Sequence, residues 1–424
     1  MQRIVLTNAR LLDGDKPARD KATIVIKGDR LERVVTGPWS DGNSTDQVYD
    51  LLGRTVMPGM VIGHYHATYT GYSAATVLPV GMEAPPAVQT IRAVNHLKLA
   101  LHAGFTGVVS AGAPYAIDAA CKDAINQGLI EGPRMVAGSR DVSTTGHSQD
   151  GFAWYWGEGT SAQTNIVDGA DNFRRAVREE IKRGAEMIKV FATAGHGTFG
   201  PSPGLELTEE ELGAAIDAAH QRGARIRAHI AHRGAILTAV RLGLDVVDHG
   251  DGLDQECIDR MLEKGTFLVP SMFYPFRVSQ VASGPQIDAM KKDMYEMYKI
   301  LPVANRAGLA MTLGDDHGAQ PLDHGNYADE LEFYVKEVGI PPLDVIRWAT
   351  KFGGELMGRG HELGTITEGK LADLLVVDGD PVKDIALLRS QDKLLAVMKG
   401  GKFVRSRLTQ SETLNAGVRR LAPA

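Results

Sequence analysis

The sequence of 424 residues predicts an α/β protein, with a (β/α)8 TIM barrel and a small β-sandwich domain built from both chain ends. Three patterns support this fold class. Residues 1–56 consist of short strand patterns with turns, and residues 57–362 alternate apolar strand-length runs with amphipathic helix-length segments. Residues 363–408 return to strand patterns and complete the sandwich, and the polar residues 409–424 form a C-terminal arm.

The middle region contains eight apolar runs that we interpret as the parallel strands of the barrel. Their cores are residues 57–66, 105–111, 134–139, 187–192, 225–229, 246–250, 266–271 and 309–316. Helix-length amphipathic segments lie between them, for example residues 207–222 and 233–242. Eight such units predict a closed barrel, whose active site lies at the carboxyl ends of the strands.

The composition is that of an ordinary globular protein and excludes several function classes. Hydrophobic residues make up 43% and charged residues 23%, and the net charge of −6 is spread along the chain. The sequence has no stripe of lysine and arginine that would indicate a nucleic-acid partner. Cys121 and Cys257 form no CxxC pair, which favours a reducing compartment. We see no secretory leader and no apolar run of about 18 residues, so we expect a cytoplasmic protein without membrane contact.

Metal-binding side chains stand where the predicted strands end. Because side chains alternate along a strand, His64 and His66 lie on one face, with Tyr65 opposite. The fourth strand carries Lys189 inside an apolar run. Strands five, six and eight end in three further candidates: His229, His249 and Asp316. These six residues would converge on one barrel mouth, where imidazole and carboxylate groups bind divalent cations such as Zn²⁺.

Each of these residues also has a simpler explanation when taken alone. A histidine at a strand end can be a hydrogen-bonded polar group near the surface. Lys189 could extend to solvent or pair with a carboxylate, and Asp316 could cap the following helix. The presence of all six on one face of a barrel favours the metal site.

Lys189 decides how many metal ions are expected. A lysine ammonium would be repelled by divalent ions, whereas its amine can react with CO₂ to form an anionic carbamate that bridges two cations. Two ions generate a bridging hydroxide at neutral pH and polarise a carbonyl group. Asp316 would accept the proton of the attacking hydroxide and deliver it to the leaving group.

The chain resembles the amidohydrolase superfamily, in particular its two-metal members, over nearly its whole length. The motifs that carry the resemblance are Pro58-Gly59, His64-Tyr65-His66, Ile188-Lys189-Val190, Ala228-His229, Asp248-His249-Gly250, Gly314-Asp315-Asp316 and Gly364-Thr365-Ile366 followed by Gly369-Lys370-Leu371-Ala372-Asp373-Leu374. The resemblance implies two divalent ions with the following ligands: His64, His66 and Asp316 for one, His229 and His249 for the other, and carboxylated Lys189 as the bridge. Zn²⁺ is the default ion, and Co²⁺, Mn²⁺ or Fe²⁺ would also suit these ligands.

Within the superfamily the chain looks most similar to Xaa-Pro dipeptidases, arginine carboxypeptidase-like enzymes and ochratoxinase-like amidases, which cleave an amide beside a free carboxylate. The loop Thr144-Thr145-Gly146-His147 matches a Thr-Gly-Gly-His element of that group, which implies that His147 donates to the substrate carbonyl or the transition state. The alternative is a histidine in a surface loop.

Three positions depart from the pattern of these families. The aspartate usually found two residues before the first histidine is Ile62 here. Residues Glu206-Leu207-Thr208 replace a Gln-Tyr-Ser element, and His229-Ile230-Ala231 lacks the second histidine of a His-Ala-His motif. These departures weaken the transfer of dipeptidase specificity but leave the metal ligands in place.

The substrate contacts are predicted from residues that follow the strands. Two of the four tryptophans, Trp154 and Trp156, lie in one loop after the third strand. They would form an aromatic wall for an apolar or aromatic substrate, or else pack against another loop or subunit. Further candidates for substrate contact are Tyr69, His196, Tyr274 and His317.

The predicted function is hydrolysis of a C–N amide bond in a peptide-like or N-acyl amino acid substrate with an apolar or aromatic group. Deaminases and imidazolonepropionases are rivals on the same fold, but most use one metal and lack the strand-four lysine. A lactone or carbamate hydrolase would use the same machinery, and a scaffold protein without activity would have lost ligands. We expect a small-molecule substrate and a homo-oligomer.

Overall fold

The structure, a computed structural model, describes residues 2–37, 42–43, 45–71, 83–150, 163–198 and 204–410. Contacts within the chain divide it into two compact units. The first comprises Met1–Val61, Ala100–Gly107 and Pro341–Ala424, and the second comprises Ile62–Leu99 and Val108–Ile340. This division rests on contacts alone, so the domain boundaries drawn from the sequence stay predictions.

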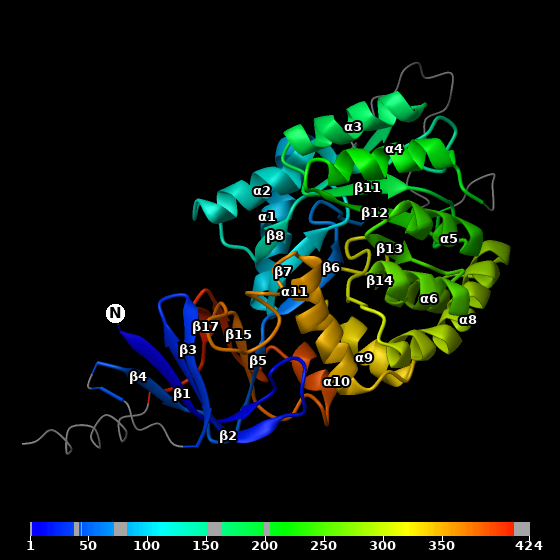
Figure 1. Cartoon of the computed structure of the whole chain (residues 1–424). Helices are drawn as coiled ribbons and strands as arrows, with labels where there is room; N and C mark the ends of the chain where they lie inside the picture. The colour runs from blue at the N-terminus through cyan, green and yellow to red at the C-terminus, as the bar shows by residue number, and fades with distance from the viewer. Residues whose placement is uncertain are drawn as a thin grey trace, which may run out of the picture. The chain divides into compact units, whose positions relative to one another are not determined.

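The first unit is organised by an eight-stranded sheet with the order β17-β16-β15-β5-β1-β2-β3, in which β4 also pairs with β1. Its strands are β1 (Arg3–Leu11), β2 (Arg19–Lys27), β3 (Arg30–Thr36), β4 (Gln47–Asp50), β5 (Thr55–Pro58), β15 (Leu374–Val377), β16 (Leu394–Lys399) and β17 (Lys402–Ser406). β5 pairs with β1 on one side and antiparallel to β15 on the other. The sheet therefore combines strands from the two chain ends, drawn in blue and in orange to red in Figure 1.

Alternating apolar residues form the core of the first unit. Along β2, Ala22, Ile24 and Ile26 join one buried cluster, and Leu374 and Val376 of β15 join the same cluster. This period of two is what a half-buried strand requires. The helical segments of this unit are α10 (Pro342–Arg347), a π-helix (Trp348–Phe352), α11 (Gly353–Leu356) and a 3₁₀ helix (Ile385–Arg389).

The remaining strands form two sheets. One has the order β6-β7-β8, with β6 (Met60–Tyr65), β7 (Phe105–Ser110) and β8 (Arg134–Val136). The other has the order β10-β9-β11-β12-β13-β14, with β9 (Gly138–Ser143), β10 (Thr164–Ile166), β11 (Met187–Phe191), β12 (Arg225–Ile230), β13 (Val246–His249) and β14 (Phe267–Val269). Every pair in the six-stranded sheet is parallel, as the alternation of strands and helices predicts.

Helices connect these strands, and α3 to α6 cover one side of β11 to β14 (Figure 1). The helices are α1 (Pro86–His102), the 3₁₀ turn Pro114–Ala116, α2 (Ile117–Asn126), α3 (Ala170–Lys182), α4 (Glu209–His220), α5 (Arg233–Leu242), α6 (Gln255–Lys264), α7 (Phe273–Val281), α8 (Pro285–Ala307) and α9 (Asp329–Lys336). α4 begins with a capping box, because Thr208 and Glu211 each accept the other's backbone N–H. No helix in the described part of the chain is both long enough and apolar enough to cross a membrane.

Two predicted strands differ in the structure. The third is interrupted at Ala137, whose carbonyl oxygen accepts from the backbone N–H groups of both Glu186 and Met187, and it resumes as β9. The prediction of a regular eighth strand is wrong, because residues 309–316 form only one β-bridge, between Met311 and Leu268. This segment still bonds on both sides, with Thr312 N–H donating to Leu268 of β14 and Leu313 accepting from Gly63 N–H of β6 at 2.5 Å.

Candidate metal centre

One pocket is lined by all six residues that the sequence singles out as metal ligands. His64, Lys189, His229 and His249 lie in β6, β11, β12 and β13, and His66 and Asp316 follow β6 and the Met311 segment. Five of the six are almost fully buried, whereas the side chain of Asp316 is 20% exposed. The strands thus bring together residues that are up to 252 positions apart, from 64 to 316.

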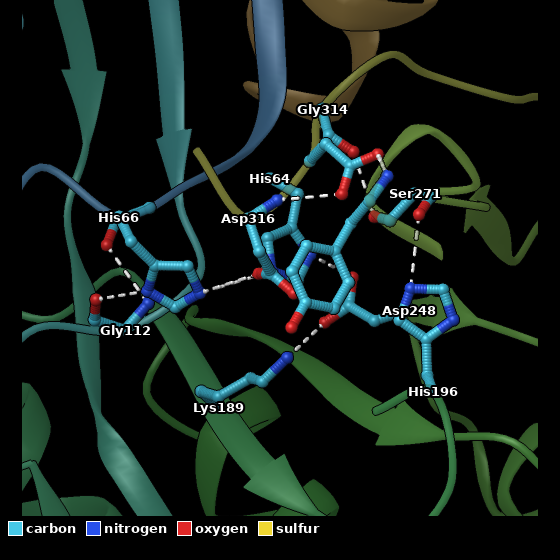
Figure 2. A network of polar contacts seen from close by, with 12 residues as sticks. His64, His66, Gly112, Lys189, His196, Asp248, Ser271, Gly314 and Asp316 are labelled. Carbon is cyan, nitrogen blue, oxygen red and sulfur yellow. Dashed lines mark hydrogen bonds and ion pairs between the residues drawn. The ribbon is translucent and has the colours of Figure 1, made fainter. Parts of the chain in front are cut away.

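His64, His66 and Asp316 form the tightest part of the pocket (Figure 2). Asp316 Oδ1 lies 3.0 Å from His64 Nε2 and 3.4 Å from His66 Nε2, and the two Nε2 atoms are 3.2 Å apart. Burial alone would raise the pKa of the Asp316 carboxyl, but the two histidines hold it well below its usual range. Two lone-pair nitrogens and an ionised oxygen that face one another are a suitable donor set for a divalent cation.

Backbone carbonyls determine which ring nitrogen of two histidines is free for a metal. His66 Nδ1 lies 2.9 Å from Gly112 O, and His229 Nε2 lies 3.1 Å from Gly195 O. A carbonyl oxygen can only accept, so each of these nitrogens carries the hydrogen. In the neutral rings the lone pair is therefore on Nε2 of His66 and on Nδ1 of His229.

His249 supplies the clearest indication of a missing partner. Its Nδ1 is buried and has no hydrogen-bond partner among the described residues. Its ring centroid lies 4.4 Å from that of His229, and burial lowers the pKa of both rings well below the ordinary value. His249, His64 and Asp316 offer ligand atoms that all lie within 4.8 Å of one another. Neutral imidazoles close to an ionised carboxylate fit a bound cation.

Lys189 extends into the pocket from β11 and forms a buried ion pair. Its Nζ lies 2.6 Å from Asp248 Oδ2, as Figure 2 shows, and its backbone N–H donates to Ser139 Oγ. Arg227 also bonds to Asp248, with Nε 2.9 Å from Oδ2 and Nη2 2.5 Å from Oδ1. Burial alone would raise the pKa of Asp248, but Arg227 and Lys189 hold it well below its usual range.

Sequence reasoning missed Arg227 and Asp248 as parts of the site. The sequence could have indicated Arg227, because it stands two residues before His229 in β12 and its side chain therefore lies on the same face of the strand. Asp248 precedes His249, and its side chain contacts Lys189 rather than solvent. A charged residue at an inward strand position is rarely buried unless paired, and this marks both residues as functional candidates.

Two glycines allow strand ends to meet closely at the site. A Cβ atom at Gly63 would overlap Thr312 Oγ1 and lie 2.9 Å from Leu313 O. A Cβ atom at Gly314 would overlap the backbone nitrogen of His64, and the φ of +145° at Gly314 disfavours any other residue. These contacts fix the distance between His64 and Asp316.

Three of the predicted substrate contacts line the pocket. They are Tyr69, His196 and Tyr274. Tyr69 stacks on His66 with ring centroids 3.9 Å apart, whereas His196 stacks on His249 at the same distance. Both nitrogens of His196 face acceptors, at 2.9 Å from Asp251 Oδ1 and 3.1 Å from Ser271 O.

His196 therefore forms part of the pocket wall through its ring face. Burial alone would lower the pKa of His196, but the Asp251 carboxylate raises it above the ordinary value. Because both ring nitrogens donate to fixed acceptors, neither is directed to a substrate.

The remaining predicted contacts lie outside the pocket lining or outside the described residues. His147 Nε2 lies 2.9 Å from Glu206 Oε2, and its Nδ1 accepts from Gln149 N–H. His317 packs edge-on against Tyr327 at 4.8 Å, and burial lowers the pKa of both His147 and His317 to about 4. The predicted contacts of His147 and His317 with a substrate depend on the conformation of their loops and stay predictions. Trp154 and Trp156 lie outside the described residues.

Comparisons with known proteins agree with this geometry. The model of the amidohydrolase family matches residues 55–404. The ochratoxinase of Aspergillus niger is 28% identical over 379 residues, which cover 82% of this chain and 75% of the relative. A solved Xaa-Pro dipeptidase with bound methionine in the active site is 27% identical with a TM-score of 0.83, covering 97% of this chain and 100% of that chain. A solved prolidase complexed with N-methylphosphonate-L-proline is 28% identical with a TM-score of 0.85, covering 96% of this chain and 100% of that chain.

The family match spans well over half of the sequence and includes every residue of the pocket described above. The structural matches extend over both units of the chain. The chain therefore belongs to the amidohydrolase family and is a hydrolase that acts on C–N bonds.

Proposed function

We propose that this protein uses two divalent metal ions to hydrolyse an amide bond in a peptide-like or N-acyl amino acid substrate. The observation that carries the proposal is the convergence of four histidines, Lys189 and Asp316 on one pocket. The names ochratoxinase and Xaa-Pro dipeptidase, borne by similar proteins, support an amide substrate.

The proposal includes a closed (β/α)8 barrel around this pocket. Two observations support closure: the segment that contains Met311 bonds to β14, and its Leu313 carbonyl accepts from Gly63 of β6. In this arrangement Lys189 stands in the middle of β11, and the other proposed ligands stand near the carboxyl end of a strand or after it, on the side where barrel enzymes have their active sites.

The ligands are proposed in two groups, with zinc as the first candidate ion. His64, His66 and Asp316 would bind one ion, because Asp316 Oδ1 lies within 3.4 Å of both imidazoles. His229 and His249 would bind the other. A bridge would form when the neutral Lys189 amine adds to CO₂ and loses a proton, which gives an anionic carbamate with two oxygens.

The side chains of the pocket suggest how the reaction proceeds. When bound, the metal ions would polarise the substrate carbonyl and lower the pKa of a water molecule to near neutrality. Asp316 is ionised and partly exposed, so its carboxylate can accept the proton of the attacking water and pass it to the leaving nitrogen. Tyr69 and Tyr274 line the pocket beside the metal ligands and offer apolar surface to the substrate.

A hydrolysis screen with zinc-reconstituted protein tests this function. The panel would contain dipeptides, N-acyl amino acids and aryl amides, with lactones, carbamates, cyclic amides and amino-purines alongside, and mass spectrometry would identify the products. Cleavage of amides beside a free carboxylate supports the proposal. Ammonia released from a ring, or lactone opening without amide cleavage, would overturn the substrate class.

The matched control is Asp316→Asn, which keeps the size of the side chain and removes its charge. This variant should lose activity toward every substrate that the wild type cleaves, because it lacks both a metal ligand and the proposed proton carrier. Activity that survives in Asp316→Asn would come from a contaminant or from another site.

A further inference from the structure

We infer that Arg227 and Asp248 are a positioning pair that fixes the ring of His64 in its metal-binding orientation. This inference rests on the proposed metal centre and goes beyond it, because neither residue would touch the metal or the substrate.

The pair is fully buried and makes two parallel bonds. Arg227 in β12 and Asp248 in the neighbouring strand β13 both have side chains that are 0% exposed. Arg227 Nε lies 2.9 Å from Asp248 Oδ2, and Nη2 lies 2.5 Å from Oδ1. This two-bond geometry orients the carboxylate as well as neutralising it.

The guanidinium is itself anchored to other strands of the second unit. Arg227 Nη1 donates to Gly63 O in β6 at 2.9 Å and to Ser110 O in β7 at 3.2 Å. Arg227, which lies in β12, therefore connects three strands: β12, β6 and β7. Its bond to Gly63 holds the backbone directly before His64. Arg227 therefore contacts both the backbone next to His64 and the ring of His64.

The hydrogen on His64 decides whether the ring can bind a metal. His64 Nδ1 lies 3.3 Å from Asp248 Oδ1 and 3.2 Å from Arg227 Nη2. If Nδ1 accepted from Arg227, Nε2 would carry the hydrogen of the neutral ring and could not bind a cation. If Nδ1 donates to Asp248, the lone pair is on Nε2, which faces Asp316 Oδ1 at 3.0 Å. The metal-binding form therefore requires Asp248 as the acceptor.

Arg227 keeps Asp248 in place whatever happens to Lys189. In this structure Asp248 Oδ2 is shared between Lys189 Nζ at 2.6 Å and Arg227 Nε at 2.9 Å. A carboxylated Lys189 would no longer offer an ammonium group. Arg227 would then be the remaining cation bonded to Asp248 among the described residues, so the buried carboxylate would stay compensated.

Metal titration of matched variants tests the inference. Asp248→Asn and Arg227→Lys are conservative in size or charge, but neither retains the two-bond ion pair. Loss of such a supporting partner weakens metal affinity by about 10–100-fold. In competition with a chromogenic chelator, we expect one of the two zinc equivalents to weaken by about that factor in both variants. The equivalent bound through His229 and His249 should change little.

A control separates positioning from general stability. Glu180→Gln breaks another arginine–carboxylate pair of the second unit, in which the buried Glu180 lies 2.7 Å from the partly buried Arg140, outside the pocket lining. The Glu180→Gln variant should bind both zinc equivalents with the wild-type affinities. The absorption spectrum of the Co²⁺-substituted protein should differ from wild type only in the Asp248→Asn and Arg227→Lys variants. Thermal melts would confirm that each variant is folded under the titration conditions.

The outcomes distinguish this inference from the function on which it rests. A wild-type protein that binds no zinc would overturn the proposed function itself. A wild type that binds zinc, together with Asp248→Asn and Arg227→Lys variants that bind it within twofold of wild type, would overturn only the positioning role. Equal weakening in Glu180→Gln would also overturn it, because the effect would then be a general consequence of lost stability.

Discussion

Lys189 is the residue on which the proposed chemistry depends most strongly. Its Nζ is buried and lies 2.6 Å from Asp248, so the side chain is held at the pocket in one direction. Placement beside two histidine pairs suits a ligand that bridges two cations. The number of metal ions and the activity should therefore both depend on this one amine.

Replacing Lys189 by alanine should remove most of the bound metal and nearly all activity. The variant lacks the proposed bridge and leaves Asp248 with Arg227 as its remaining cationic partner among the described residues. Elemental analysis of the reconstituted protein and the hydrolysis rate are the two measurements. Lys182→Ala, which changes an exposed lysine at the end of α3, is the control. Full metal content with a wild-type rate in Lys189→Ala would end the two-metal account.

At this scale the sequence identifies residues on strands far better than residues in loops. His64, His66 and His229 could be predicted because strand alternation fixes the face on which a side chain lies. His147 could not be placed in this way, since its ring turns toward Glu206 in a loop that has no periodicity. The pairing of Arg227 with Asp248 depends on which strands are neighbours, and that is a property of the tertiary structure.

Close packing between elements brings β6 and the Met311 segment together. Gly63 in β6 meets Thr312 and Leu313 at a distance that leaves no room for a Cβ atom. The sequence predicted an eighth strand here, but only one bridge forms, because Gly314 N–H donates to Glu330 instead of continuing a ladder. A short irregular segment therefore carries Asp316, and glycines rather than a regular strand determine its position.

Gly63→Ala should be destabilised by about 1–3 kcal/mol, because the added methyl group forces apart two packed segments. The matched control is Gly234→Ala in α5, where a Cβ atom meets nothing within 4 Å. That variant should be neutral or slightly stabilised, since alanine favours a helix. Thermal melts of both variants provide the comparison, and equal effects would show that close packing at Gly63 is unimportant.

The buried carboxyl of Glu330 in α9 predicts a pH dependence of stability. Burial raises its pKa from the ordinary 4.5 to about 8. Between these values the folded protein holds a proton that the unfolded chain has released. The stabilisation is fully present below about pH 4.5 and is lost as the pH rises through about 8, so stability falls across this window.

Glu330→Gln removes the Glu330 contribution and should make the pH dependence shallower. Melting temperatures of metal-loaded protein from pH 5 to 8.5 should therefore fall more steeply for the wild type than for the variant. Glu337→Gln changes an exposed carboxylate directly after the same helix and should follow the wild type. Parallel curves of melting temperature against pH for the wild type and Glu330→Gln would contradict the assignment of this pH dependence to Glu330.

Over the whole molecule, the proposed metal ligands come from elements that are far apart in the sequence. β6, β11, β12 and β13 each carry one of them, and Asp316 follows the Met311 segment. Bound ions would connect these elements in the folded chain and not in the unfolded one. The alternation of strands and helices was predictable because its period is local, whereas the proposed closure of the barrel would depend on bonds between distant segments such as Leu313 and Gly63.

Removing the metal with a chelator should abolish activity and lower the thermal midpoint of the protein. A ligand present at about 1,000 times its dissociation constant contributes about 4 kcal/mol to stability. Restoring zinc should restore both properties. The Asp316→Asn variant should show a much smaller shift on chelation, because it binds less metal from the start. An unchanged midpoint in the wild type would show that the ions do not connect these strands.

Diffraction from crystals of the zinc-reconstituted protein, recorded at the zinc absorption edge, tests the central claim most directly. The account predicts two anomalous peaks in the pocket lined by His64, His66, Lys189, His229, His249 and Asp316. One peak should lie beside Asp316, the other beside His229 and His249, with density for a carbamate on Lys189 between them. A single peak without that density would contradict the two-metal centre, and no peak in the pocket would contradict the metal site altogether.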